Sequence, residues 1–339
     1  MLVRKNNIGV IRHTLQLAMS RQDGQNIVVF GEDVGKLGGV FRATKHLQEE
    51  FGEKRCFDFP IAEASLVGVA VGMAINGLKP VVEIQFSGFV FPALQNLFCH
   101  VARYRNRTRG RFSCPIVVRM PVGAWKGALE HHSESLEALF AHTPGLKVVI
   151  PSTPSTTKGL LLSALKSKDP VVFLEPLMTY YAPFEEIKPD YYEIPLGKAR
   201  VVNYDQVAGK KIDLTVVSYG ATVFDCLKAI SLFNQTSEQK KTIELIDLLT
   251  ISPWDEETVI NSVRKSGRLL VVHEAVASFS VSSEIITRIT EKCLLDFKCS
   301  PERVTGYDVV IPLEKGQQLF LVSPEKIVVK MQKMLTSEY

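Results

Sequence analysis

The sequence predicts an α/β protein with two domains built on mainly parallel sheets. Short apolar runs such as Ile27–Phe30 and Val171–Leu174 alternate with segments of helical periodicity, which is typical of parallel strands covered by helices on both faces. A stretch rich in proline and tyrosine at 176–197 separates two such series, and 339 residues are many for one domain. We expect two three-layer α/β domains. The expected first domain, linker and second domain cover 1–176, 177–197 and 198–339.

Local sequence signals predict two helices in the first half of the chain. Apolar residues at helical spacing predict a helix over 8–21. Thr153 followed by Pro154 is typical of an N-cap and a first helical residue, so a helix is expected from there to about Lys166. The other elements expected here are helices at 44–51, 62–75 and 91–105 and strands at 27–30, 81–84, 116–119, 147–150 and 171–174.

The second half shows the same alternation of strand and helix. Ser323 followed by Pro324 is expected to cap a terminal helix, and Val304 is expected to begin the last strand. The other elements expected here are strands at 214–218, 243–246 and 269–272 and helices at 221–233, 255–266 and 280–293.

The composition excludes several classes of protein. The six cysteines are scattered without a C-x-x-C pair, which argues against a disulfide or zinc scaffold. No apolar run reaches the roughly 18 residues of a membrane span, and the polar start MLVRKNNIGV lacks the apolar core of a signal peptide. A formal charge of +4 does not indicate a nucleic-acid partner. We expect a cytoplasmic protein that binds neither membrane nor nucleic acid.

Glu63 is a candidate functional residue because it lies within the mainly apolar stretch 59–74. Burying a carboxylate without a partner costs several kcal/mol, so a residue in this setting usually has a partner or a catalytic task. A glutamate that shares its proton can hydrogen-bond a ring nitrogen of a ligand. The alternative is a solvated glutamate in the first turn of a helix, stabilised by the helix dipole.

Two polar clusters have both a functional and a structural interpretation. His131 and His132 stand among carboxylates, so metal binding is conceivable, but no third ligand is evident. One of these histidines could instead face a cleft as a hydrogen-bond donor or general acid. A run of alternating arginines could form a nucleic-acid-binding patch, but the C-terminus of a helix followed by an interface loop explains it better. The arginines are Arg103, Arg105, Arg107, Arg109 and Arg111.

Six longer segments, taken in their order along the chain, indicate a family. They are FGEDVGKLGGVFRAT (30–44), FPIAEASLVGVAVGMAINGLKPVVEIQF (59–86), HHSESLEALFAHTPGLKVVIPSTP (131–154), KGLLLSALKSKDPVVFLEP (158–176), IDLLTISPWD (246–255) and SGRLLVVHEA (266–275). Nearly end to end, the chain resembles the β subunits of the E1 component of 2-oxo acid dehydrogenases, which are transketolase-like thiamine enzymes. The resemblance implies a thiamine-pyrimidine-binding domain followed by a transketolase C-terminal-type domain.

The resemblance also implies roles for three side chains. Glu63 matches the glutamate that hydrogen-bonds N1′ of the aminopyrimidine of thiamine diphosphate and so promotes formation of the reactive carbanion. Phe89 matches an aromatic position that packs against the pyrimidine ring. His132 matches the histidine that lines the active-site channel and assists transfer of the acetyl group, whereas His131 matches a more variable position.

A potassium site is implied by the same resemblance, held largely by backbone carbonyls that leave little side-chain signature. The matching positions are Ile116, Ala164, Leu165, Ser167 and Asp169.

The diphosphate half of the cofactor has no counterpart in this sequence. Thiamine enzymes hold the diphosphate and Mg²⁺ with a G-D-G motif and a downstream asparagine, and this chain has no G-D-G. The resemblance therefore implies that an E1 α subunit supplies the diphosphate and Mg²⁺ half, in a heterotetramer of two α and two β chains. Small residues four apart are expected at the contact with the second β subunit, namely Ala64, Gly68 and Gly72.

Pyruvate is the expected substrate, and the E2 dihydrolipoamide acetyltransferase, through its lipoyl domain, is the expected acceptor. The segments Gly88–Val90 and 273–285 favour the bacterial pyruvate enzyme over a branched-chain 2-oxo acid enzyme, which stays an alternative. A non-catalytic scaffold of the same fold is the second alternative. Trp125 stands where many relatives have glycine and could narrow the substrate entrance or fill a subunit contact.

Overall fold

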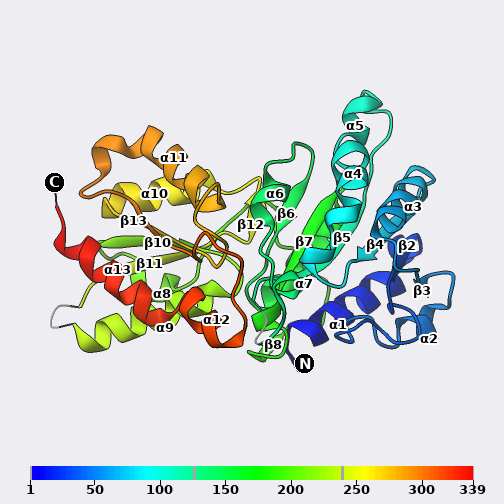
Figure 1. Cartoon of the computed structure of the whole chain (residues 1–339), viewed down its shortest axis with the longest axis horizontal. Helices are drawn as coiled ribbons and strands as arrows, with labels where there is room; N and C mark the ends of the chain where they lie inside the picture. The colour runs from blue at the N-terminus through cyan, green and yellow to red at the C-terminus, as the bar shows by residue number, and fades with distance from the viewer. Residues whose placement is uncertain (1, 125–126, 238–239, 339) are drawn as a thin grey trace. The chain divides into compact units, whose positions relative to one another are not determined.

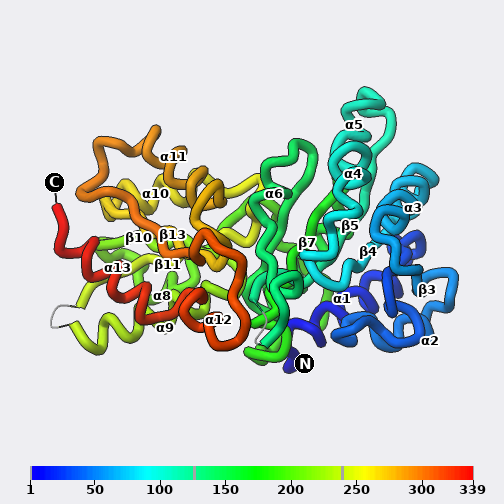
Figure 2. The backbone as a smooth tube through the Cα atoms, viewed as in Figure 1, coloured from blue at the N-terminus to red at the C-terminus, as the bar shows by residue number. Residues whose placement is uncertain are grey.

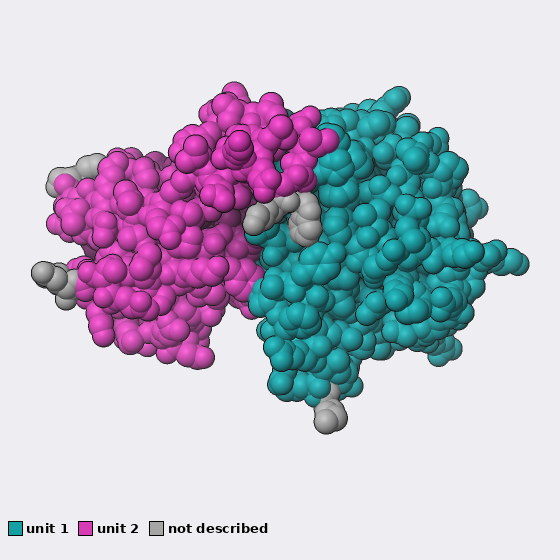
Figure 3. Space-filling view, turned by 60° about the horizontal axis from the view of Figure 1, so that its bottom comes forward, with its two compact units in different colours: residues 1–125, 131–196 teal, residues 126–130, 197–339 magenta. Residues whose placement is uncertain are grey.

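The computed structural model describes residues 2–124, 127–237 and 240–338, so Trp125 lies outside the described residues. Two compact units are present, coloured separately in Figure 3. One contains residues 1–125 and 131–196, and the other contains 126–130 and 197–339. Each is an α/β unit with a mainly parallel sheet, as the sequence predicts.

The first unit is built on a parallel sheet that carries the candidate site. Its strands follow the spatial order β6-β7-β5-β4-β2-β3, and each neighbouring pair is parallel. Nearly every residue of the inner strands β2, β4, β5 and β7 is buried, as expected for a sheet covered on both faces. The strands are β2 (Ile27–Gly31), β3 (Cys56–Asp58), β4 (Lys79–Glu83), β5 (Val117–Val122), β6 (Lys147–Val149) and β7 (Val171–Pro176).

Helices flank this sheet in two groups. Helix α1 packs against α7, and α3 packs beside α4 (Figure 1). Thr153 caps α7 in a capping box with Thr156, and Pro154 is the first helical residue, which confirms the start predicted there. The helices are α1 (Asn7–Ser20), α2 (Leu47–Phe51), α3 (Glu63–Ile75), α4 (Leu94–Asn96), α5 (Tyr104–Arg107), α6 (Glu137–Ala141) and α7 (Pro154–Lys166).

Two of the predicted helices differ from the observed ones. The helix expected over 91–105 is a 3₁₀ turn at Phe91–Ala93, then α4, a π-helical turn at Leu97–Val101 and α5. A π turn adds one residue per turn and shifts the buried face, which periodicity alone does not reveal. Helix α2 begins only at Leu47, because His46 takes the left-handed conformation with φ of 71°.

The stretch at 176–197, predicted as a linker, is attached to the first unit. Strand β8 (Glu185–Ile187) pairs antiparallel with β1 (Val3–Lys5), close to the N-terminus in Figure 2. The carboxylate of Glu185 accepts hydrogen bonds from the backbone N–H and Oγ of Ser155, both at 2.9 Å, in the first turn of α7. Lys158 donates to the carbonyls of Lys188 and Pro189 at 2.7 and 2.6 Å. The first unit extends to residue 196.

The second unit has a sheet of order β14-β13-β10-β11-β9, in which only the β9 and β11 pair is antiparallel. Helix α9 packs with α13, and α10 packs with α11. Val304 ends β14 rather than beginning it, which corrects the predicted start of the last strand. The elements are α8 (Tyr204–Val207), α9 (Thr222–Thr236), α10 (Glu256–Ser266), α11 (Val281–Cys293), α12 (Glu314–Phe320), α13 (Pro324–Thr336), β9 (Arg200–Val201), β10 (Leu214–Ser218), β11 (Ile243–Asp247), β12 (Thr250–Ser252), β13 (Leu269–Val272) and β14 (Glu302–Val304).

Across the described parts of the chain, no helix has the length and apolar character needed to cross a membrane.

Candidate functional site

The candidate site lies at the carboxyl edge of the first sheet. Strands β2, β3, β4 and β5 are parallel, so their carboxyl ends share one edge, which is where open α/β sheets bind ligands. Glu32 directly follows β2, Glu63 follows β3, Phe89 follows β4, and His132 follows β5. The topology therefore brings residues that are far apart in sequence to the same edge.

Phe89 and His132 belong to one cluster of rings. The ring centroid of Phe89 lies 5.2 Å from that of His132 and 5.6 Å from that of His131. Phe86 is 5.5 Å from Phe89 and 4.5 Å from His132, both in edge contacts. Such edge-to-face contacts are favourable and fix ring orientation. The Phe89 and His132 side chains are both only partly buried.

Gly88 allows the turn after β4 to approach the segment after β5 that contains His131. A Cβ added at Gly88 would overlap the backbone carbonyl oxygen of His131. Next to it, Ser87 Oγ donates to the Glu134 carbonyl at 2.8 Å, and the backbone N–H of Gly123 donates to the same oxygen at 2.9 Å. The turn after β4 and the segment after β5 are thus joined by direct hydrogen bonds.

Glu63 is the first residue of α3 and is partly buried. Among the residues that the structure describes, none forms a hydrogen bond or ion pair with its carboxylate. Burial, together with the negative charges of Glu63 and Asp33, raises the pKa of Glu32. Two partly buried carboxylates therefore lie close enough to interact. Asn96 Nδ2 donates to the Ala64 carbonyl at 2.6 Å and holds the start of α3 against α4.

A buried ionic network lies beneath the ring cluster and was not predicted from the sequence. Arg119 on β5 pairs with Glu175 on β7 through two hydrogen bonds of 2.7 and 3.1 Å, and with Glu83 on β4 at 2.9 Å. The Tyr180 hydroxyl donates to Glu175 at 2.6 Å. The Arg119 side chain is 1% exposed. The available signal was a charged residue, within the strand or near its end, in each of three apolar strands.

The electrostatics of this network keep Arg119 charged. Burial acts to lower the pKa of Arg119, but Glu175 and Glu83 outweigh it and the net shift is upward. Burial raises the pKa of Glu83, and Arg119 opposes that rise. The bidentate pair and the Tyr180 hydroxyl satisfy the charged groups, which buried ions require.

The network also supports the rings above it. The Tyr180 ring lies 5.1 Å from that of Phe41, and Phe41 lies 5.4 Å from Phe86, which contacts His132. A continuous series of contacts therefore connects the buried Glu175 to the exposed side of the ring cluster.

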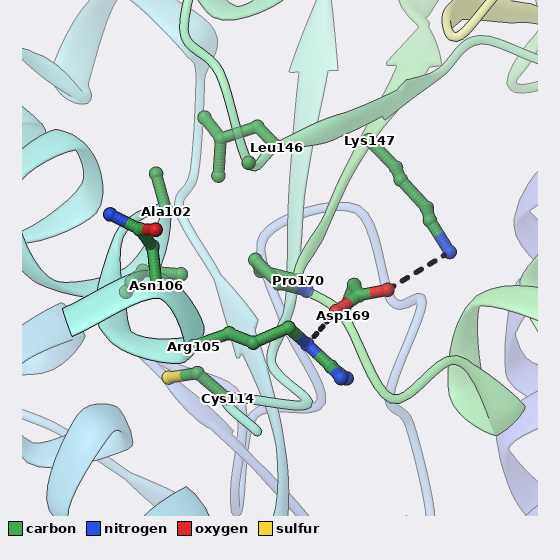
Figure 4. A pocket seen from close by; sticks show the side chains of 10 residues that line it. Ala102, Arg105, Asn106, Cys114, Leu146, Lys147, Asp169 and Pro170 are labelled. Carbon is green, nitrogen blue, oxygen red and sulfur yellow. Dashed lines mark ion pairs between the residues drawn. The ribbon is translucent and has the colours of Figure 1, made fainter. Parts of the chain in front are cut away.

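The positions that the family resemblance assigns to potassium lie at another place in the first unit. The Lys79 ammonium donates to the Leu165 carbonyl and, at 3.1 Å, to the Ser167 carbonyl. The Asp169 carboxylate pairs with Arg105 at 2.6 Å and with Lys147 at 3.6 Å (Figure 4). A cavity of about 320 Å³ adjoins this cluster and is lined in part by Arg105, Lys147 and Asp169. Two carbonyls of this proposed potassium site already accept hydrogen bonds from Lys79, and the side chains around Asp169 are cationic. These residues therefore do not fit a bound potassium ion.

The other polar clusters have partners within the chain. Arg107 donates to the Cys99 carbonyl at 2.6 Å and bonds His100 at 3.0 Å, and Arg105 pairs with Asp169. In the part of the chain that the structure describes, no group of three or more His, Cys, Asp or Glu side chains could hold a metal ion. All six cysteines are free thiols.

Comparison with protein families gives two matches. Residues 10–182 match the transketolase pyrimidine-binding domain, and residues 204–327 match the transketolase C-terminal domain. These matched ranges cover most of the two α/β units.

Comparison with curated proteins gives similar chains of nearly the same length. The chain is 52% identical to the pyruvate dehydrogenase E1 component subunit beta of Mycoplasma genitalium, over 93% of this chain and 94% of that protein. It is 50% identical to the protein of the same name from Acholeplasma laidlawii, over 96% of each. It is also 44% identical to the mitochondrial 2-oxoisovalerate dehydrogenase subunit beta of Dictyostelium discoideum, over 91% of this chain and 81% of that protein.

Among solved structures, a split-gene transketolase, described as an inactive beta4 tetramer, matches with a TM-score of 0.77. It is 18% identical and the match covers 98% of this chain and 99% of that one. At this identity the likeness shows the transketolase fold alone.

Proposed function

This chain belongs to the family of pyruvate dehydrogenase E1 component beta subunits, and we propose that it forms the pyrimidine-binding half of a thiamine diphosphate site in such an enzyme. The reaction would be oxidative decarboxylation of pyruvate, with transfer of the acetyl group to the lipoyl group of E2. The observation that carries the proposal is identity of 50–52% over nearly the whole chain to E1 beta subunits of that name.

The residues at the carboxyl edge of the first sheet fit the pyrimidine half of the cofactor. When bound, thiamine diphosphate supplies the carbanion-stabilising chemistry by which a 2-oxo acid loses CO₂. The Glu63 carboxylate has no hydrogen-bond partner among the described residues, so it would bond the pyrimidine nitrogen and hold a proton there. The partly buried Phe89 ring would pack against the pyrimidine, in an orientation fixed by its contacts with Phe86 and His132.

His132 would act on the substrate side of the site. Edge contacts with Phe86 and Phe89 position its ring. The imidazole can therefore serve as a hydrogen-bond donor or acid with little further loss of its own conformational entropy. We assign to it the orientation of the substrate carboxylate and assistance in acetyl transfer to the lipoyl group.

The proposed enzyme is a heterotetramer of two α and two β subunits. The absence of a G-D-G motif in the sequence supports an E1 α subunit as the source of the diphosphate site and of Mg²⁺. On α3, Gly68 is partly buried and Gly72 is exposed, which supports a close contact there with the second β subunit. The E2 acetyltransferase and its lipoyl domain would then receive the acetyl group in a bacterial cytoplasm.

A branched-chain 2-oxo acid is the second candidate substrate, favoured by the 44% identity to a 2-oxoisovalerate dehydrogenase subunit beta. The site residues considered above do not distinguish the two substrates. The ratio of kcat/KM for pyruvate to that for 2-oxoisovalerate separates them.

The decisive experiment is co-purification with candidate E1 α chains, followed by an assay of 2-oxo acid decarboxylation and of lipoyl acetylation. We expect a stable α and β complex that prefers pyruvate. A preference for 2-oxoisovalerate would establish the second candidate. An assembled complex, with thiamine diphosphate and Mg²⁺ present, that turns over neither substrate would favour a scaffold without catalytic activity.

A further inference from the structure

Lys79 occupies a distinctive position at the start of β4. Its ammonium donates to the backbone carbonyls of Leu165 and Ser167, the latter at 3.1 Å. Leu165 lies in the last turn of α7, and Ser167 is the C-cap residue that follows this helix. The last carbonyls of a helix lack partners within the helix and carry its partial negative charge, so a cation is favourable there. Lys79 therefore joins the end of α7 to the first strand residue of β4.

The other carbonyls of the potassium positions also accept hydrogen bonds from this chain. The Ile116 carbonyl accepts from the backbone N–H of Val171 at 2.9 Å. The Ala164 carbonyl accepts from the Ser167 N–H at 3.1 Å, and the Asp169 carbonyl accepts from Ser167 Oγ at 2.8 Å. Each of the five carbonyls that the resemblance assigns to potassium thus has a donor within the chain.

The cationic side chains around these carbonyls disfavour binding of a potassium ion. Lys147 Nζ lies 3.2 Å from Ser167 Oγ and 3.6 Å from the Asp169 carboxylate. Arg105 Nε lies 2.6 Å from the same carboxylate, and Figure 4 shows both side chains directed at Asp169. Three cationic side chains and one carboxylate therefore surround the segment, and like charges at such distances repel.

We propose that the Lys79 ammonium takes the place of a bound potassium ion in this chain and fixes the end of α7 and the segment after it to β4. A lysine ammonium is a compact charge with three donors, so it can satisfy several carbonyls as a monovalent cation would. Because it is covalently attached, it is present at any salt composition. The end of α7 and the segment after it would then be held to β4 without bound potassium.

The protonation state of Lys79 sets the conditions for a test. Burial lowers the pKa of Lys79 to about 8, so the side chain is mainly protonated at pH 7. Thermal unfolding of the full chain should be followed at that pH in potassium, sodium or choline chloride of equal concentration. We expect the same unfolding temperature in all three salts. A rise that occurs with potassium alone, and that saturates as its concentration increases, would overturn the proposal.

Variants at position 79 test directly whether the Lys79 ammonium takes the place of potassium. Lys79→Met removes the ammonium and leaves two carbonyls without their donor, so we expect an unfolding temperature lower by about 3–6 °C in sodium or choline chloride. Potassium should restore part of this loss, because the vacated carbonyls can then bind it. Lys79→Arg, which keeps a cation at this position, should lose less stability than Lys79→Met.

Lys147→Met is the matched control. Lys147 bonds a side-chain oxygen and a partly exposed carboxylate, so its loss should give no selective response to potassium. An unchanged unfolding temperature for Lys79→Met, or equal curves for that variant in the three salts, would contradict the proposal. If Lys79→Met does not fold, Lys79→Gln and the salt series on the unchanged chain decide the question. Because the readout is thermal unfolding, its outcome does not depend on the proposed catalytic function.

Discussion

The rings of Phe89 and His132 meet edge to face, with centroids 5.2 Å apart and planes at 75°. Phe89 follows β4 and His132 follows β5, so the contact joins the segments that follow two paired parallel strands. Hydrogen bonds from Ser87 and Gly123 to the Glu134 carbonyl hold the two segments together. Because the rings are in contact, we expect substitutions at the two positions to be non-additive.

Glu63→Gln should abolish most turnover without preventing assembly. The amide keeps the size of the side chain but cannot share a proton with a pyrimidine nitrogen, and such proton transfer is worth about 10²–10⁴-fold in rate. The measurement is pyruvate-dependent dye reduction by the purified α and β complex. Glu53→Gln, at an exposed position, is the matched control and should behave as the unchanged protein. An assembled Glu63→Gln enzyme of full activity would remove Glu63 from the mechanism.

His132→Asn should affect acetyl transfer more than decarboxylation. If His132 assists the transfer, acetylation of a lipoyl domain should fall by at least about tenfold more than dye reduction does. His131→Asn is the matched control, because that ring also contacts Phe89, at 5.6 Å. Equal losses in both assays for His132→Asn, or a larger loss for His131→Asn, would contradict the assignment.

The isolated chain should bind thiamine diphosphate weakly. The proposal places the diphosphate and Mg²⁺ contacts on the α subunit, so the β chain alone offers only the pyrimidine contacts of Glu63 and Phe89. Calorimetric titration of the β chain, with and without Mg²⁺, should show little heat compared with the α and β complex. Tight Mg²⁺-dependent binding to the β chain alone would exclude a divided site.

Arg119→Met should strongly destabilise the first unit. It leaves Glu83 and Glu175 buried without their cation, and breaking a buried pair in this way costs about 3–5 kcal/mol. Urea denaturation followed by a probe in the first unit measures the loss. A combined Arg119→Met, Glu83→Gln and Glu175→Gln variant should recover part of it, because no buried charge is then unpaired. Equal stability of Arg119→Met and the unchanged chain would disprove the buried pairing.

Asp225 should make the second unit less stable as the pH rises. Burial raises the pKa of Asp225 to about 6, with Glu325 adding to the rise and Lys228 opposing it. The folded state therefore binds this proton more tightly than the unfolded state, whose value is about 3.9. The resulting stability is fully present below pH ~4 and is lost as the pH rises through about 6.

Asp225→Asn removes this effect. We expect the free energy of unfolding to rise by about 1 kcal/mol near pH 7.5, after allowance for partial exposure, and to change little near pH 4. Denaturant unfolding at the two pH values measures the difference. The exposed Asp205→Asn serves as control. A variant equally stabilised at both pH values would show that titration of Asp225 is not the cause.

The sequence predicts the regular elements well where a local signal is strong. The cap at Thr153 and Pro154 and the apolar periodicity of α1 act within a few residues, and both helices are observed. The π turn at Leu97–Val101 and the left-handed His46 depart from regular helix geometry, and the spacing of apolar residues does not encode such departures. The pairing of β8 with β1 joins residues about 180 positions apart, beyond the reach of any local pattern.

The candidate site was predictable only in part, for a similar reason. Family resemblance identifies Phe89 and His132, and the structure places their rings in contact. The pairing of Arg119 with Glu175, and of Lys79 with the end of α7, depends on which strands are neighbours. The sequence shows that an apolar strand carries a charged residue, but it does not show which residue is its partner.

The ionic network beneath the rings has a consequence for biosynthesis. Glu83 precedes Arg119 by 36 residues, and Glu175 follows it by 56. On the ribosome, the arginine therefore emerges well before one of its two carboxylates, and the strand that carries it cannot be buried at low cost until β7 has been translated. A nascent chain halted before residue 175 should remain a client of chaperones and a substrate for proteases.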